Sequence, residues 1–120
     1  MSAKSIRIMI VDDDQDLAES LGDLLRLNGY EVELAKDGKD ALVQAQAQHF
    51  DVTFMDVRMP VMNGVESCLA IKQVRPDARI VMMTGFKEPI LEKALGAGAE
   101  GPLQKPFNVK NMLEIVKTAG

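Results

Sequence analysis

The feature that most constrains the fold is an alternation, repeated five times, of short apolar runs with amphipathic helical patterns. Three runs are mostly apolar and have the length of a strand, which is typical of buried parallel strands: 6–11, 52–55 and 80–83. Segment 30–34 alternates apolar and acidic residues, as a half-exposed edge strand does. Segment 101–104 contains Pro102, which cannot donate to a ladder, and is predicted at the other edge.

Helices are predicted after each of these strands. Asp14 and Asp37 are suitable N-caps for the first two, and the third should run from near Gly64 to Arg75. The fourth opens near Pro89, a residue favoured in a first turn. Apolar residues at helical spacing give the inward faces of the first and last helices: Leu17, Leu21, Leu24 and Leu25, then Val109, Met112, Leu113 and Val116.

Five strands alternating with five helices predict a doubly wound α/β fold, because right-handed crossovers pack helices on both faces of a parallel sheet. With apolar strands in the centre and half-polar strands at the edges, the flavodoxin-like strand order 2-1-3-4-5 fits best. Residues 1–120 then form a single domain with a core at about 6–119, and no effector domain is expected within them.

Composition excludes several classes of protein. The 14 Lys and Arg against 18 Asp and Glu give a net charge of −4, and Trp is absent, so a nucleic-acid surface is not expected. The single cysteine, Cys68, excludes an internal disulfide and fits a reducing compartment, which predicts a cytoplasmic protein with a packed thiol. No apolar run has the length of a membrane span.

Polar residues stand where the predicted strands end. The first strand runs into Asp12, Asp13 and Asp14, the third into Asp56, the fourth into Thr84 and the fifth into Lys105. In the predicted order these four strands are neighbours, so their carboxyl ends should converge on one pocket. Clustered carboxylates resist joint ionisation unless a cation neutralises them. Magnesium suits such a site, because it binds a few carboxylate oxygens and leaves positions for phosphate.

Asp56 is the carboxylate best placed to act as a nucleophile, since it follows a buried strand and stands apart from the acidic cluster. An aspartate can form an acyl phosphate. Phosphoryl transfer depends on positioning and charge neutralisation, for which Lys105 and the Thr84 hydroxyl are available. The residues therefore predict a magnesium-assisted phosphoryl acceptor.

Four motifs, "IVDDD", "MDVRMPVMNG", "MMTG" and "LQKPF", resemble the receiver domain of two-component response regulators in order and spacing. The resemblance implies a signalling phosphoprotein, not an enzyme for other substrates, that takes a phosphoryl group on Asp56 from a histidine kinase or phosphotransfer protein. It implies that Asp12, Asp13, Asp56 and the main-chain carbonyl of Arg58 hold Mg²⁺. It also implies phosphoryl contacts from Thr84 and Lys105, a cis bond after Lys105, and an output domain or target protein.

The chain departs from this family at Pro102, where an aromatic residue usually stands three residues before the lysine. The usual aromatic switch is therefore absent. This favours a phosphorelay role, or output through another signalling surface, over output through the face formed by the fourth helix, the fifth strand and the fifth helix. Arg58 and Phe86 occupy positions that govern water access to the phosphoryl group, and neither orients a water in an obvious way. Slow self-dephosphorylation is therefore expected.

Alternatives remain open from the sequence. A receiver-like interaction module that is never phosphorylated would share the motifs. A flavin carrier would share the fold, but three aspartates after the first strand would repel its phosphate. A magnesium-dependent phosphatase would share the chemistry, yet the chain lacks room for a cap domain. Among single residues, Asp14 and Asp16 are expected to start a helix, and His49 to be an exposed helix residue.

Overall fold

Ten elements alternate along the chain in the computed structural model, which describes residues 5–85, 88–105 and 109–119. The strands are β1 (Arg7–Val11), β2 (Glu31–Ala35), β3 (Val52–Asp56), β4 (Ile80–Thr84) and β5 (Glu100–Gln104). The helices are α1 (Gln15–Leu27), α2 (Gly38–Ala47), α3 (Gly64–Val74), α4 (Leu91–Gly96) and α5 (Val109–Lys117).

The five strands form one parallel sheet in the order β2-β1-β3-β4-β5. This is the predicted order, and both predicted edge strands lie at the edges. The three central strands are buried along almost their whole length. The first and second strands begin one residue later than the apolar pattern suggested, at Arg7 and Glu31.

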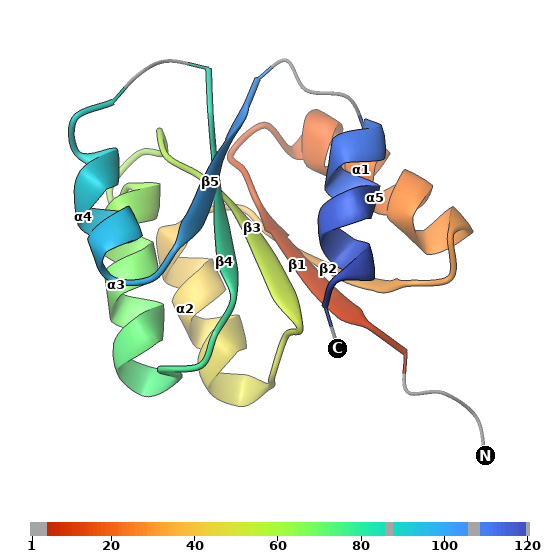
Figure 1. Cartoon of the computed structure of the whole chain (residues 1–120), viewed down its shortest axis with the longest axis horizontal. Helices are drawn as coiled ribbons and strands as arrows, with labels where there is room; N and C mark the ends of the chain where they lie inside the picture. The colour runs from red at the N-terminus through yellow and green to blue at the C-terminus, as the bar shows by residue number, and fades with distance from the viewer. Residues whose placement is uncertain (1–4, 86–87, 106–108, 120) are drawn as a thin grey trace.

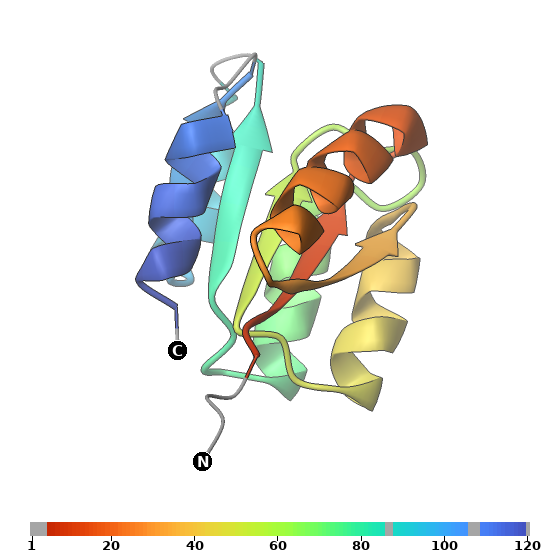
Figure 2. The ribbon, with the colours of Figure 1, turned by 90° about the vertical axis from the view of Figure 1, so that its right-hand side faces the viewer.

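Helices cover both faces of the sheet, with α1 and α5 on one side and α2, α3 and α4 on the other (Figures 1 and 2). Successive strand residues point to opposite faces and so enter two separate apolar clusters. In β1, Met9 and Val11 face the cluster beneath α2 to α4, whereas Ile8 and Ile10 face the one beneath α1 and α5. Burial on both faces explains why the central strands are mostly apolar.

Side chains cap the first three helices. Asp14 accepts a hydrogen bond from the Leu17 amide at 3.1 Å, and Asp37 accepts one from the Asp40 amide at 2.8 Å, as predicted. Asn63 and Glu66 form a capping box at the start of α3. The caps matter for function, because α1 and α3 begin directly beside the carboxyl ends of β1 and β3.

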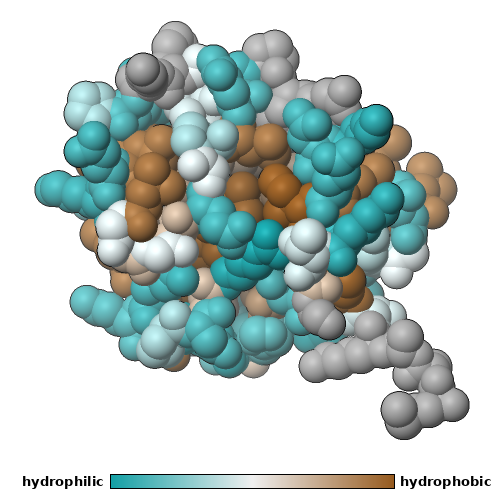
Figure 3. All heavy atoms as spheres, in the orientation of Figure 1, coloured by the Kyte–Doolittle hydropathy of each residue, from teal (hydrophilic) through white to brown (hydrophobic). Residues whose placement is uncertain are grey.

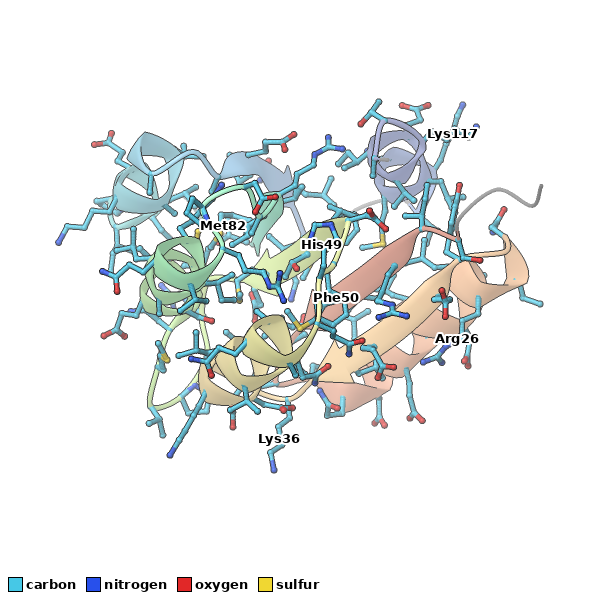
Figure 4. All side chains as sticks on the ribbon, turned by 90° about the horizontal axis from the view of Figure 1, so that it is seen from below. Arg26, Lys36, His49, Phe50, Met82 and Lys117 are labelled. Carbon is cyan, nitrogen blue, oxygen red and sulfur yellow. The ribbon has the colours of Figure 1, made fainter. Side chains whose placement is uncertain are left out.

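Three local predictions were wrong. Leu24 is 41% exposed, because the inward face of α1 is formed by its neighbours Leu21 and Leu25. Pro89 precedes α4, where amide bonds from Leu91 to Glu88 and from Glu92 to Pro89 make a tighter turn before the helix. His49 is exposed, as predicted, but it lies beyond the end of α2, where its Nε2 is 3.7 Å from Oδ1 of Asp51 (Figure 4).

Among the helices of the described residues, none combines the length and the apolar character that crossing a membrane requires.

Candidate functional site

Strand register brings the predicted site residues to one edge of the sheet. Val11 pairs with Met55, so Asp12 and Asp56 occupy adjacent positions at the ends of β1 and β3. On the other side, Thr84 pairs with Gln104, which sets Lys105 at the end of β5. The Lys105 amide continues this pairing by donating to the Thr84 carbonyl at 2.7 Å.

Three of the predicted carboxylates form a compact acidic group. Asp12, Asp13 and Asp56 each offer one oxygen, and these oxygens lie within 4.8 Å of one another. Asp12 is 1% exposed and Asp56 8%, whereas Asp13 is exposed to solvent. Asp14 stands outside the group as the N-cap of α1, and its amide donates to Oδ1 of Asp12 at 2.9 Å.

Lys105 joins this group from the opposite side of the site. Its Nζ lies 2.6 Å from Oδ2 of Asp12 and 3.5 Å from Oδ1 of Asp56. The two aspartates are therefore neutralised in part by an ammonium that comes from the edge strand. The sequence predicted that these residues would converge, and the structure brings them together.

Burial dominates the electrostatics of Asp56. Desolvation and the neighbouring charge of Asp12 raise the pKa of Asp56 to about 6, although the charge of Lys105 acts in the opposite direction. Burial opposes the charged form of Lys105, but its hydrogen bond to Asp12 and the charge of Asp56 outweigh burial and raise the pKa of Lys105. Asp56 thus carries a carboxylate that a further cation would stabilise.

Thr84 ends β4 with its side chain almost completely buried at the same edge of the sheet. It stands one position beyond Met83, which pairs with Asp56 in the register of β3 and β4. Thr84 therefore lies beside Asp56 at the carboxyl edge of the sheet.

The donor set fits a hard divalent cation. Three carboxylate oxygens from two neighbouring strand ends and one exposed loop converge, which is the kind of ligand that Mg²⁺ prefers. Lys105 already supplies one positive charge at this place, and the acidic group still exceeds it in negative charge. One member, Asp13, is open to solvent, so waters can complete the coordination shell.

The loop after Asp56 lines a groove beside the acidic group. This groove has a volume of about 570 Å³ and is lined by Asp13, Val57, Arg58, Met59, Pro60, Asn63, Glu88 and Ile90. The Arg58 guanidinium pairs with the Glu88 carboxylate across it. Sequence reasoning missed Glu88, because 30 residues separate the partners and no local pattern links them.

Four further residues named from the sequence need separate comment. Pro102 lies in the edge strand β5, as predicted, and follows a cis peptide bond from Gly101. The predicted cis bond at Pro106 and the predicted influence of Phe86 fall outside the described residues. Cys68 is buried on the inward face of α3, as predicted.

Comparison with known proteins agrees with this geometry. The family model for the response regulator receiver domain matches residues 8–117. The response regulator MprA of Mycobacterium bovis is 39% identical over 111 residues, which are 91% of this chain and 48% of that protein. The chain thus spans about half the length of the curated relatives it matches.

Two solved structures share the fold. The chemotaxis protein CheY4 of Vibrio cholerae is 35% identical, with a TM-score of 0.86 over 95% of this chain and 98% of its own. A response regulator of Burkholderia pseudomallei, described as carrying a phosphorylated aspartic acid, a calcium ion and citrate, is 29% identical. It has a TM-score of 0.85 over 95% of this chain and 68% of its own. The family match extends over almost the whole sheet and includes every strand end described above, so this chain belongs to the receiver domains of response regulators.

Proposed function

We propose that Asp56 is the phosphoryl acceptor of this receiver domain and that Asp12, Asp13, Asp56 and the main-chain carbonyl of Arg58 hold Mg²⁺. The observation that carries the proposal is the position of the Lys105 ammonium, 2.6 Å from Asp12 and 3.5 Å from Asp56, beside three converging carboxylates. The relative from Burkholderia pseudomallei supports it, because its structure is described as holding a phosphorylated aspartic acid and a divalent cation.

In the proposed reaction an Asp56 oxygen attacks phosphorus. A new oxygen–phosphorus bond forms while the bond to the donor breaks, and the donor keeps the electron pair of that bond. Lys105 neutralises charge on the transferred group, and the Thr84 hydroxyl donates to one of its oxygens. A bound Mg²⁺ would supply the remaining charge compensation and would align the phosphoryl oxygens.

The donor is proposed to be a histidine kinase or a histidine phosphotransfer protein. Asp56 would be modified once per transfer, so the domain would catalyse only its own phosphorylation and dephosphorylation. Because the chain spans about half the length of its curated relatives, the output is proposed to be a further domain or a separate target protein. Dependence on a kinase that uses ATP supports action in the cytoplasm.

Intact-mass measurement after incubation with acetyl phosphate tests the proposal. One phosphoryl adduct is expected with Mg²⁺, and none with a chelator or in Asp56→Asn. Asp14→Asn is the matched control, because asparagine also caps a helix and Asp14 lies outside the acidic group. An adduct that persists in Asp56→Asn, or that forms equally without metal, would overturn the proposed site.

A further inference from the structure

The ion pair between Arg58 and Glu88 joins the two loops that flank the acceptor. Arg58 belongs to the loop between β3 and α3, and Glu88 to the segment that leads into α4. From this pair we propose that Arg58 leaves Glu88 for a phosphoryl group on Asp56, and that the loss of this tether loosens the first turn of α4. The inference rests on the proposed function and deepens it by naming an output route.

Both partners line the groove that adjoins the acidic group at Asp13. Arg58 follows Asp56 by two residues, and its side chain lines the same groove as Asp13, a member of the acidic group. Glu88 lines this groove as well. Arg58 therefore pairs with Glu88 in a groove that adjoins the acidic group, two residues along the chain from Asp56.

The charges favour an exchange of partners. A phosphoryl group brings a charge between −1 and −2 and three strong acceptor oxygens, whereas Glu88 offers a single negative charge. Guanidinium groups bind phosphate oxygens in a bidentate way. The Arg58 side chain is 67% exposed, whereas that of Glu88 is 15% exposed. The same new charge repels the Glu88 carboxylate. Attraction of Arg58 and repulsion of Glu88 therefore both favour separation of the ion pair.

Helix α4 is poorly secured at its amino terminus. It has six residues, and within the described part of the chain no side chain caps it. Its start depends on the turn from Glu88 to Ile90, in which the Leu91 amide donates to the Glu88 carbonyl at 3.0 Å. Short helices without caps open at low cost. Releasing the Glu88 side chain should therefore loosen this turn before any other part of the fold.

The loosened segment borders a second groove, of about 390 Å³, between α4 and β5. Its lining includes Thr84, Glu88, Leu91, Glu92, Leu95, Pro102 and Gln104. Figure 3 shows apolar side chains gathered on this face beside β5. Glu88 lines both grooves. Its release would therefore couple phosphorylation of Asp56 to the groove between α4 and β5, and this coupling would not need an aromatic residue at position 102.

Hydrogen exchange measured by mass spectrometry tests this route on the whole chain. Exchange in peptides covering 88–95 should accelerate roughly fivefold or more in Glu88→Gln and in Arg58→Ala without phosphorylation, which corresponds to losing one modest interaction. Wild type carrying the adduct should show the same acceleration, whereas phosphorylated Glu88→Gln should show no further increase. Arg26→Ala, which removes a surface ion pair with Asp23, is the control and should respond to phosphorylation as wild type does.

The outcomes separate the two proposals. No adduct on Asp56 overturns the proposed function and this inference with it. An adduct of confirmed mass with unchanged exchange at 88–95 overturns the inference alone. So does a Glu88→Gln variant that still responds to phosphorylation as wild type does, because the tether would then play no part.

Discussion

Gly64 approaches the main chain of Asp56 so closely that a Cβ at this position would lie 2.0 Å from the Asp56 carbonyl oxygen. The first residue of α3 is thus packed against the last residue of β3, and the Gly64 amide donates to the Val57 carbonyl at 2.9 Å. This contact holds the two ends of the loop that carries Arg58 close together.

Gly64→Ala should therefore destabilise the fold by about 3 kcal/mol, because the added methyl group meets main-chain atoms that cannot move aside. Urea unfolding followed by circular dichroism measures the change. Gly96→Ala is the control, since a Cβ there meets nothing within 4 Å and the residue is helical, so stability should be unchanged or slightly higher. Equal stabilities of the two variants would contradict the close approach.

Lys105→Met should slow adduct formation from acetyl phosphate by about 10²-fold, the usual cost of removing one group that stabilises a developing charge. The variant keeps the length and apolar stem of the side chain and loses only the ammonium near Asp12 and Asp56. Lys39→Met removes an exposed charge on α2 and should react at the wild-type rate. A wild-type rate in Lys105→Met would exclude Lys105 from the reaction.

The raised pKa of Asp56 predicts a particular dependence of stability on pH in metal-free buffer. The folded state holds this proton up to about pH 6, whereas the unfolded chain releases it near the ordinary value of 3.8. The folded state therefore binds more protons between these values, and the contribution of Asp56 to the free energy of unfolding falls as pH rises through them. Asp56→Asn has no proton to lose at this position. Between pH 4 and 7, the difference in free energy of unfolding between this variant and wild type should therefore shift by up to about 3 kcal/mol in favour of the variant. Parallel stability profiles for the two proteins would contradict the raised pKa.

Magnesium should stabilise the folded protein at pH 7.5, with each tenfold excess over Kd adding about 1.4 kcal/mol to the free energy of unfolding. The gain should shrink at pH 5, because the protonated Asp56 carboxyl competes with the metal. Thermal unfolding with and without Mg²⁺ at both pH values measures this. Asp12→Asn should lose the effect and Asp14→Asn should keep it, since only Asp12 belongs to the acidic group. A gain of the same size in Asp12→Asn would place the ion elsewhere.

The sheet and its helices could be predicted because each depends on a repeating pattern. Continuous apolar runs indicated the central strands, and the alternation around Glu31 and Glu33 indicated an edge. Asp14 and Asp37 marked helix starts, because capping is a local interaction. The exact limits of an apolar face are set by neighbouring elements, which is why Leu24 was misplaced.

The acidic site could be predicted in outline because parallel strands end at a common edge. That rule brought Asp12, Asp56 and Lys105 together without coordinates. It could not indicate that Lys105 lies nearer to Asp12 than to Asp56, since that depends on side-chain packing. The pairing of Arg58 with Glu88 was missed for the same reason, because it depends on the shapes of two loops.

Val61 holds a left-handed backbone conformation, which is unusual for a β-branched residue. Its φ is 68°, its side chain is fully exposed, and the Met62 amide donates to the Pro60 carbonyl at 2.8 Å, which closes a tight turn centred on Val61. The strain is not offset by burial of the side chain, so Val61→Asn should raise the free energy of unfolding by about 1 kcal/mol. Val43→Asn, at an exposed helical position in α2, should change it little, because the two residues have similar helix propensities. Urea unfolding of both variants distinguishes relief of backbone strain from a general gain through surface polarity, and a Val61→Asn variant no more stable than wild type would contradict the strain.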